Sequence, residues 1–236
     1  EEIELLQKAC NITEKGVRRL LSFVKPGVWE YEIEAELMHE FLRNRSKGFA
    51  YTPIIASGEN ANVLHYIANN MQCKDGDLIL LDIGAEYANY SSDLTRMIPV
   101  NGKFTARQKE IYNAVLDMKN FATSLLVPGN NWYDYHKECG EFYTSKFLEL
   151  GLLDKADVQN QDKNWPAYKK YMMHGTSHHL GLDTHDYGIL KDKFVENMVF
   201  TVEPGIYLPA EGFGVRIEDD MVIQNSGPAF NLMKNI

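Results

Sequence analysis

Four of the seven histidines in this 236-residue chain lie within the stretch MMHGTSHHLGLDTHD, residues 172–186. Imidazoles bind transition metals and transfer protons near neutral pH, so the cluster indicates a metal site or an acid–base site. His174 and His178 have the i, i+4 spacing of a helical metal site, but nearby glycines disfavour a helix and the H-E-x-x-H pattern is absent. We therefore expect a strand or tight loop, in which His174 and His178 share one face and His179 points away. The fourth histidine of the cluster is His185.

Two acidic residues flank an expected hairpin in LLDIGAEYANYSSD. If the hairpin tip lies at Tyr87–Ala88, Asp82 and Asp93 become direct cross-strand neighbours, with Cβ atoms roughly 4.5 to 5.5 Å apart. Adjacent carboxylates repel each other unless one is protonated or a cation lies between them. The pair therefore predicts a cation site. The alternative is that Asp82 ends a strand and Asp93 caps a turn.

Two further acidic residues occur in the second half, Glu203 in TVEPGIY and Glu218 in VRIEDD. Each alone is also explained by a strand end or a solvated sheet edge. Strand alternation places Arg216 and Glu218 on the face opposite Val215 and Ile217. The order of an apolar strand, a carboxylate, a Gly turn, an aromatic residue and a return strand with another carboxylate repeats that of the first half. Two related halves facing each other would bring four carboxylates together, in a domain with internal pseudo-twofold symmetry.

The elements that must position these residues mix helices with strands. Thr105 followed by Gln108 is a capping-box signature that begins a helix. The segment 45–60 is predicted as a loop. The helix at 30–44 is expected to bury Ile33, Leu37, Phe41 and Leu42. Periodicity and turn residues predict helices at 1–24, 30–44 and 105–127, and a further helix that follows Pro128–Gly129 and ends at Leu150. They predict strands at 77–84, 86–99, 198–204 and 215–223.

Composition excludes several classes of protein. The chain has 33 acidic and 24 basic residues and a formal charge of −9, with no Lys/Arg run interleaved with aromatics, so nucleic acid is not an expected partner. No apolar stretch approaches the ~18 residues that a membrane span needs. Cys10, Cys73 and Cys139 are too scattered for a disulfide framework or a thiolate zinc site, which indicates a cytoplasmic setting. A helix predicted from the first residue, without an initial Met, suggests a piece of a longer protein.

The motifs HGTSHHLGLDTHD, LLDIGAEYANYSSDLTR, TVEPGIY and VRIEDD together resemble those of the dinuclear metallopeptidases of the pita-bread fold, specifically the aminopeptidase P and prolidase branch. The resemblance covers essentially the whole chain. It implies an α+β fold with a curved antiparallel sheet, helices on its outer side and internal pseudo-twofold symmetry. It also implies that residues 1–236 are the catalytic domain of a longer, homo-oligomeric chain whose N-terminal domain is missing here.

The resemblance also implies a set of five metal ligands. Asp82 chelates one ion, Asp93 and Glu218 bridge both ions, and His178 with Glu203 completes the second. One imidazole and four carboxylates make a site rich in hard oxygen ligands, which favours two Mn²⁺ ions, with Co²⁺ or Zn²⁺ as substitutes.

Roles for further residues follow from the same resemblance. It implies hydrolysis by a hydroxide bridging the two metals, with Glu203 transferring a proton and His185 supporting the oxyanion. His65 contacts the substrate and contributes to catalysis, and His174 belongs to the substrate pocket. Arg216 orients the carboxylate of Glu218.

The expected reaction is removal of the first residue from peptides with proline at the second position. A prolidase restricted to X-Pro dipeptides stays open as an alternative. A creatinase-like hydrolase that works without metals, or a peptide-binding module without catalysis, is disfavoured because all five ligand positions are intact.

Overall fold

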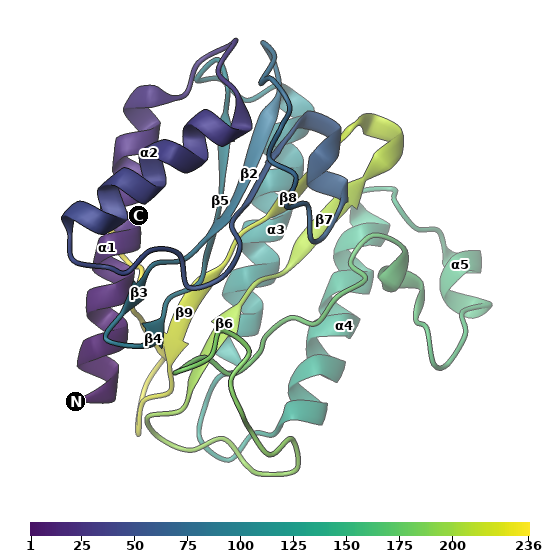
Figure 1. Ribbon diagram of the computed structural model, residues 1–236. Coiled ribbons are helices and arrows are strands. Elements are labelled where there is room, and N and C mark those ends of the chain that lie inside the picture. Colours follow the sequence, from purple (N-terminus) through teal and green to yellow (C-terminus); the bar gives the residue numbers. More distant parts are fainter.

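The computed structural model describes residues 1–236 as helices around antiparallel strands (Figure 1). The α-helices are α1 (Glu2–Phe23), α2 (Glu30–Arg43), α3 (Ala106–Ser124), α4 (Trp132–Glu149) and α5 (Lys155–Gln159). The strands are β1 (Ile54–Ser57), β2 (Leu78–Ile83), β3 (Glu86–Tyr87), β4 (Tyr90–Ser91), β5 (Leu94–Pro99), β6 (Val199–Val202), β7 (Gly205–Leu208), β8 (Phe213–Arg216), β9 (Asp219–Val222) and β10 (Phe230–Asn231). Short 3-10 helices are η1 (Gly58–Asn62), η2 (Ala167–Lys170) and η3 (Pro209–Glu211). Every strand pair is antiparallel, which confirms the predicted α+β class.

The first half contains one long hairpin interrupted near its tip. β2 pairs with β5, and the shorter β3 pairs with β4 in the same register. The turn lies at Ala88–Asn89, where both residues have positive φ, so the predicted tip at Tyr87–Ala88 was wrong by one residue. Asn tolerates the left-handed region far better than Tyr does, which explains the position of the turn.

This one-residue shift changes the pairing of the acidic residues. Asp82 lies opposite Thr95 in the register, not opposite Asp93 as predicted. Asp93 lies two residues nearer the tip, so the two aspartates are diagonal neighbours on one face of the hairpin.

The second half repeats this plan. β6 pairs with β9 and β7 pairs with β8, again with a two-residue interruption between the outer and inner pairs. The predicted single strand at 215–223 is therefore two strands, interrupted at Ile217 and Glu218. The interruption matters because Glu218 N instead donates to Thr95 O of β5, at 3.2 Å. That bond joins the two hairpins.

Two hydrophobic clusters hold the strands between pairs of helices. Ile79, Leu81 and Ile83 of β2 pack in the cluster under α1 and α2. Leu78 and Leu80, on the other face of the same strand, belong to the cluster that contains residues of α3 and α4. β2 is thus covered on both faces, as its nearly continuous apolar sequence predicted. Figure 1 shows the α1–α2 pair on one side of the strands and α3 and α4 on the other.

The helix predictions were confirmed in most details. Thr105 caps α3, accepting from Gln108 N at 3.2 Å, while Gln108 Oε1 accepts from Thr105 N at 2.9 Å. In α2 the stripe Ile33, Leu37 and Phe41 is fully buried, but Leu42 is 53% exposed, against the prediction. Leu42 lies one position, about 100° of helical rotation, beyond that stripe.

The region predicted as a loop at 45–60 contains β1, which pairs with β2. Its outer edge is covered by side chains, since Ile55 N donates to Asn69 Oδ1 and Ser57 N donates to Glu30 Oε1. The prediction missed this strand because long-range side-chain contacts complete its edge. No helix of the structure combines the length and apolar character that a membrane crossing requires.

Candidate metal centre and its cavity

A cavity of about 750 Å³ opens where the two hairpins meet, with residues of both halves in its walls. The histidine segment lies along one side without forming a helix, as predicted from its glycines. All nine residues selected from the sequence line this one cavity: His65, Asp82, Asp93, His174, His178, His185, Glu203, Arg216 and Glu218.

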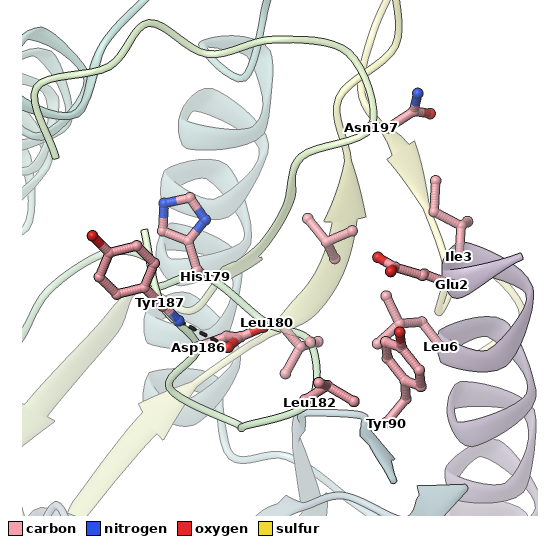
Figure 2. Close-up of a pocket in the computed structure, with 12 residues that line it drawn as sticks. Glu2, Ile3, Leu6, Tyr90, His179, Leu180, Leu182, Asp186, Tyr187 and Asn197 are labelled. Atoms are coloured by element: carbon pink, nitrogen blue, oxygen red, sulfur yellow. Dashed lines mark hydrogen bonds between the residues drawn. The ribbon is translucent and has the colours of Figure 1, made fainter. Parts of the chain in front are cut away.

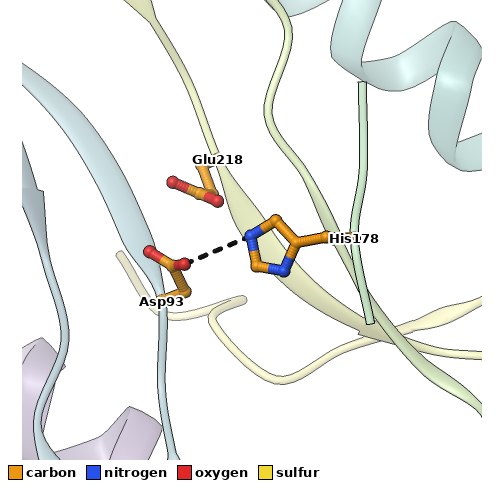
Figure 3. A group of neighbouring side chains, drawn as sticks. All are labelled: Asp93, His178 and Glu218. Atoms are coloured by element: carbon orange, nitrogen blue, oxygen red, sulfur yellow. Dashed lines mark ion pairs between the residues drawn. The ribbon is translucent and has the colours of Figure 1, made fainter. Parts of the chain in front are cut away.

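Three of these side chains lie close enough together to hold one metal ion between them. Ligand atoms of Asp93, His178 and Glu218 all lie within 4.8 Å of one another. Figure 3 shows the three side chains converging from separate segments of the chain. His178 Nε2 is 3.4 Å from Asp93 Oδ2 and 3.7 Å from Glu203 Oε1. The donor set, one imidazole with several carboxylates, fits a divalent cation of the first transition row.

The charges in the cavity give a second reason to expect a cation. Burial, together with the charges of Asp93, Glu203 and Asp82, raises the pKa of Glu218 well above its ordinary value. Burial also raises the pKa of Asp93, and it raises that of Glu203 to about 7. Carboxylates crowded in this way are ionised only at a cost unless cations balance them. The residues present therefore fit a site for divalent metal.

The histidines divide by their surroundings. Burial by itself would lower the pKa of His178, but the bond to Asp93 and the charges of Glu203 and Asp93 raise it to about 9. Burial and the nearby Arg216 lower the pKa of His174 to about 3. At His178 the neighbouring carboxylates thus outweigh the effect of burial, as expected for the histidine assigned to the metal.

The two ring nitrogens of His174 lie near two different residues, Tyr207 and Glu203. Its Nε2 lies 2.7 Å from the hydroxyl of Tyr207, and its Nδ1 lies 3.6 Å from Glu203 Oε2. His185 packs its ring edge-on against that of His178, with centroids 4.3 Å apart, and burial lowers its pKa. Both imidazoles are thus adjacent to predicted metal ligands and open to the cavity.

His179 points the other way, as predicted. Its ring packs against Phe200 and stacks on Trp132, with centroids 4.4 and 6.0 Å apart. It lines a second, smaller cavity of about 200 Å³ next to the first turns of α1. Figure 2 shows this cavity, with Asp186 accepting a hydrogen bond from Tyr187 N. His179 is therefore separated from the metal centre by its own backbone.

Tyr51 is a site residue that the sequence motifs did not reveal. Its hydroxyl lies 2.6 Å from Asp82 Oδ1 and 2.5 Å from Asp93 Oδ1, so it bridges the two diagonal aspartates. Burial and the charges of Asp82 and Asp93 raise the pKa of Tyr51 well above its ordinary value. The residue precedes β1 in the segment predicted as a loop, where no spacing or pattern marks it.

Arg216 reaches Glu218 indirectly. Its guanidinium pairs with Asp82 and donates to the Tyr207 hydroxyl at 2.7 Å. Its Nε donates to Thr95 Oγ1 at 3.2 Å, and that hydroxyl donates to Glu218 Oε2 at 2.6 Å. Arg216 comes from the second half and Asp82 from the first, so this fully buried guanidinium also ties the halves together.

Comparison with known proteins is consistent with this geometry. The model of metallopeptidase family M24 matches residues 4–225. The chain belongs to that family. The aminopeptidase P and prolidase branch is likewise borne out by the similar proteins.

An Xaa-Pro aminopeptidase of Haemophilus influenzae is 42% identical over 238 residues, covering 96% of this chain and 55% of that protein. An Xaa-Pro dipeptidase of Mus musculus is 34% identical over 273 residues, covering 96% of this chain and 55% of the dipeptidase. Zinc-substituted Escherichia coli aminopeptidase P in complex with product has a TM-score of 0.91 at 38% identity, covering 100% of this chain and 56% of that one. This similarity confirms the expected pita-bread fold. The chain spans about half the length of the curated relatives it matches.

Proposed function

We propose that this chain is the catalytic domain of a metal-dependent exopeptidase that hydrolyses the bond between an N-terminal residue and a following proline. The observation that carries the proposal is the convergence of all five predicted ligands on one cavity: Asp82, Asp93, His178, Glu203 and Glu218. The Xaa-Pro aminopeptidase of Haemophilus influenzae, at 42% identity over nearly the whole chain, supports the choice of substrate class.

The proposed cofactor is a pair of divalent ions, with Mn²⁺ preferred over Co²⁺ or Zn²⁺ because carboxylate oxygens dominate the donor set. Asp82 would hold one ion, His178 with Glu203 the other, and Asp93 with Glu218 both. Such ions would lower the pKa of a water and polarise the scissile carbonyl. A zinc-substituted relative is known among the similar structures, so metal identity is a question for experiment.

The chain's own side chains would manage protons and orientation. Glu203, which lines the cavity 3.7 Å from His178 Nε2, would accept a proton and then return it to the leaving amine. His185, which lines the cavity beside His178, would donate to the oxygen that becomes negative during attack. His174, fixed by Tyr207, would border the substrate as an uncharged imidazole at neutral pH.

Proline at the second position changes what the pocket must recognise. The bond before proline is a tertiary amide without an N–H, so the ring must be selected by shape. The aliphatic side chains of Ile54, Leu64 and Ile67 line the cavity together with His65, and they would provide the apolar contacts for the ring. His65 would contact the peptide there.

The test uses the 236-residue chain stripped of metal and assayed with and without Mn²⁺. The substrates are a longer peptide with proline second, an X-Pro dipeptide and a Met-Ala peptide as control. We expect Mn²⁺-dependent cleavage of the longer peptide. Cleavage of the dipeptide alone would favour a prolidase, an alternative that the Mus musculus dipeptidase supports. Binding of metal without cleavage of either X-Pro substrate would contradict the proposal.

Two further expectations from the sequence stay predictions. The three cysteines are free and buried, and a cytoplasmic setting is predicted from their separation. Homo-oligomer formation by the longer protein is predicted from the family resemblance.

A further inference from the structure

The segment that carries His65 has little regular structure to hold it. It runs from the end of η1 to Cys73, and three of its side chains, Leu64, His65 and Ile67, line the cavity. From Leu64 to Asn70 a single main-chain hydrogen bond is formed, from Tyr66 N to Val63 O at 3.2 Å. The position of His65 must therefore depend on side-chain contacts.

One carboxylate supplies most of those contacts. Glu30, the first residue of α2, is fully buried, and its Oε1 accepts from Ser57 N at 2.8 Å, from Ser57 Oγ at 2.6 Å and from Asn60 Nδ2 at 3.2 Å. Its Oε2 accepts from the Tyr66 hydroxyl at 2.7 Å and from Met71 N at 2.9 Å. Five donors surround this carboxylate, and none of them is a Lys or Arg side chain.

The donors bracket the His65 segment at both ends and in the middle. Ser57 and Asn60 precede it, Met71 lies near its end, and Tyr66 is the residue directly after His65. Tyr66 directs its hydroxyl to Glu30 while His65 lines the cavity. The Tyr66 hydroxyl is thus the fixed point nearest to His65 in the chain.

A second tether lies three residues beyond Tyr66, at Asn69. Asn69 accepts from Ile55 N at 3.0 Å and donates to Pro53 O at 3.0 Å and to Glu34 Oε2 at 2.9 Å. It fixes the far end of the segment to β1 and α2. Only Ile67 and Ala68 lie between these two tethers. The Glu30–Tyr66 contact is therefore the one that sets the orientation of the backbone at His65.

We propose that Glu30 is a positioning residue for His65 and acts through the hydroxyl of Tyr66. Glu30 touches neither the cavity nor the five metal ligands. It holds one wall of the cavity, the wall with Leu64, His65 and Ile67, at a set distance from the metal centre. The proposal rests on the proposed peptidase function for its kinetic consequence but not for its structural one.

The kinetic test compares Tyr66→Phe, Glu30→Gln and His65→Ala, each loaded with Mn²⁺ and assayed on the longer X-Pro peptide. Tyr66→Phe removes one hydroxyl and keeps the ring, so it is informative even if Glu30→Gln fails to fold. We expect Tyr66→Phe to lower kcat/KM by about tenfold, because misplacement of a positioning group near 1 Å has effects of this order or more. The matched control is Glu36→Gln, on the same helix but paired with Arg19, which should leave kcat/KM unchanged.

A double-mutant cycle separates positioning from general damage. In the His65→Ala background, Tyr66→Phe should change kcat/KM by less than about twofold, since the residue it positions is gone. A full tenfold loss in both backgrounds would overturn the proposal, because it would mean that Tyr66 acts independently of His65. The number of bound metal ions should be the same in Tyr66→Phe as in the unmodified chain.

Histidine-ring NMR tests the same contact without any activity. His65→Ala assigns the His65 ring signal, and Tyr66→Phe should shift or broaden that signal while leaving His179 unchanged. An unmoved His65 signal in Tyr66→Phe and Glu30→Gln would overturn the proposal. If the unmodified chain cleaves no peptide, the proposed function fails, and the NMR result still decides whether Glu30 positions His65.

Discussion

The two interrupted hairpins follow one plan but place their carboxylates differently. Asp93 and Glu218 occupy equivalent positions, each in the interruption before a return strand, β5 or β9. Glu203 in the second hairpin corresponds to Gly84 in the first. A Cβ at Gly84 would collide with the carbonyl oxygen of Ser92, so no side chain fits there. The first half instead supplies its other carboxylate two residues earlier, on the same face, as Asp82.

This difference explains why each half supports the other. The diagonal aspartates are bridged by Tyr51, and Asp82 is paired with Arg216, which belongs to the second half. Glu218 in turn accepts from Thr95 of the first half. Each hairpin therefore contributes two carboxylates and depends on a polar partner from the other, so neither half is a complete site.

The largest effect is expected from substituting Asp93, which occupies the same position in its hairpin as Glu218. Asp93→Asn removes a charge from the group formed with His178 and Glu218, and it should lower kcat/KM at least about a thousandfold, since several kcal/mol of metal-based stabilisation are lost. Circular dichroism should show an intact fold. The matched control is the exposed Asp192→Asn. Turnover like that of the unmodified chain in Asp93→Asn would refute the two-metal assignment.

Removal of metal should lower the stability of the fold, because the carboxylates of the two halves then repel one another. Because ions bound only to the folded state stabilise it, adding Mn²⁺ at about a thousand times its Kd should raise the free energy of unfolding by about 4 kcal/mol per site. Thermal unfolding with chelator and with Mn²⁺ measures this difference. A chain whose Tm is the same in both conditions would mean that the acidic cluster is stable without cations.

The Gly84 position gives a direct test of the comparison between hairpins. Gly84→Ala adds the methyl group that meets Ser92 O, and it should destabilise the fold by about 1 to 3 kcal/mol, the usual range for overpacking. Urea unfolding measures the change. Gly175→Ala is the control, because its added carbon would meet atoms only at 3.7 Å or more. Equal stability of the two variants would show that Gly84 is not sterically required.

The smallest effect should come from the bridging phenol. Tyr51→Phe removes the hydroxyl between Asp82 and Asp93, and it should weaken metal binding roughly tenfold, as losses of ligand-orienting hydrogen bonds do. Calorimetric titration with Mn²⁺ measures the affinity, and the exposed Tyr187→Phe serves as control. Unchanged affinity would assign Tyr51 to packing alone.

The sequence predicted which residues share the cavity better than it predicted the strand register. Residue types and motifs identify candidate ligands because metal chemistry limits which side chains serve. The split between His178 and His179 follows from simple alternation. The diagonal offset of Asp82 and Asp93 depends on which residue of the tip accepts a positive φ. The two neighbouring turn positions differ by only a small conformational free energy.

Long-range polar contacts were beyond the reach of the sequence. Nothing near Tyr51 marks it, because its role arises only when β1 lies beside β2. The same holds for β1 itself, whose outer edge is completed by Asn69 and Glu30. Periodicity reports which face of an element is buried, but it carries no information on which distant side chain will meet it.

The most direct test of the shared site is the number of divalent ions bound per chain at equilibrium with Mn²⁺. Dialysis followed by elemental analysis would compare the unmodified chain with Asp82→Asn in the first hairpin and Glu203→Gln in the second. We predict two ions per chain, falling to one or fewer in each variant. Two ions retained in both variants would contradict a site built from both halves.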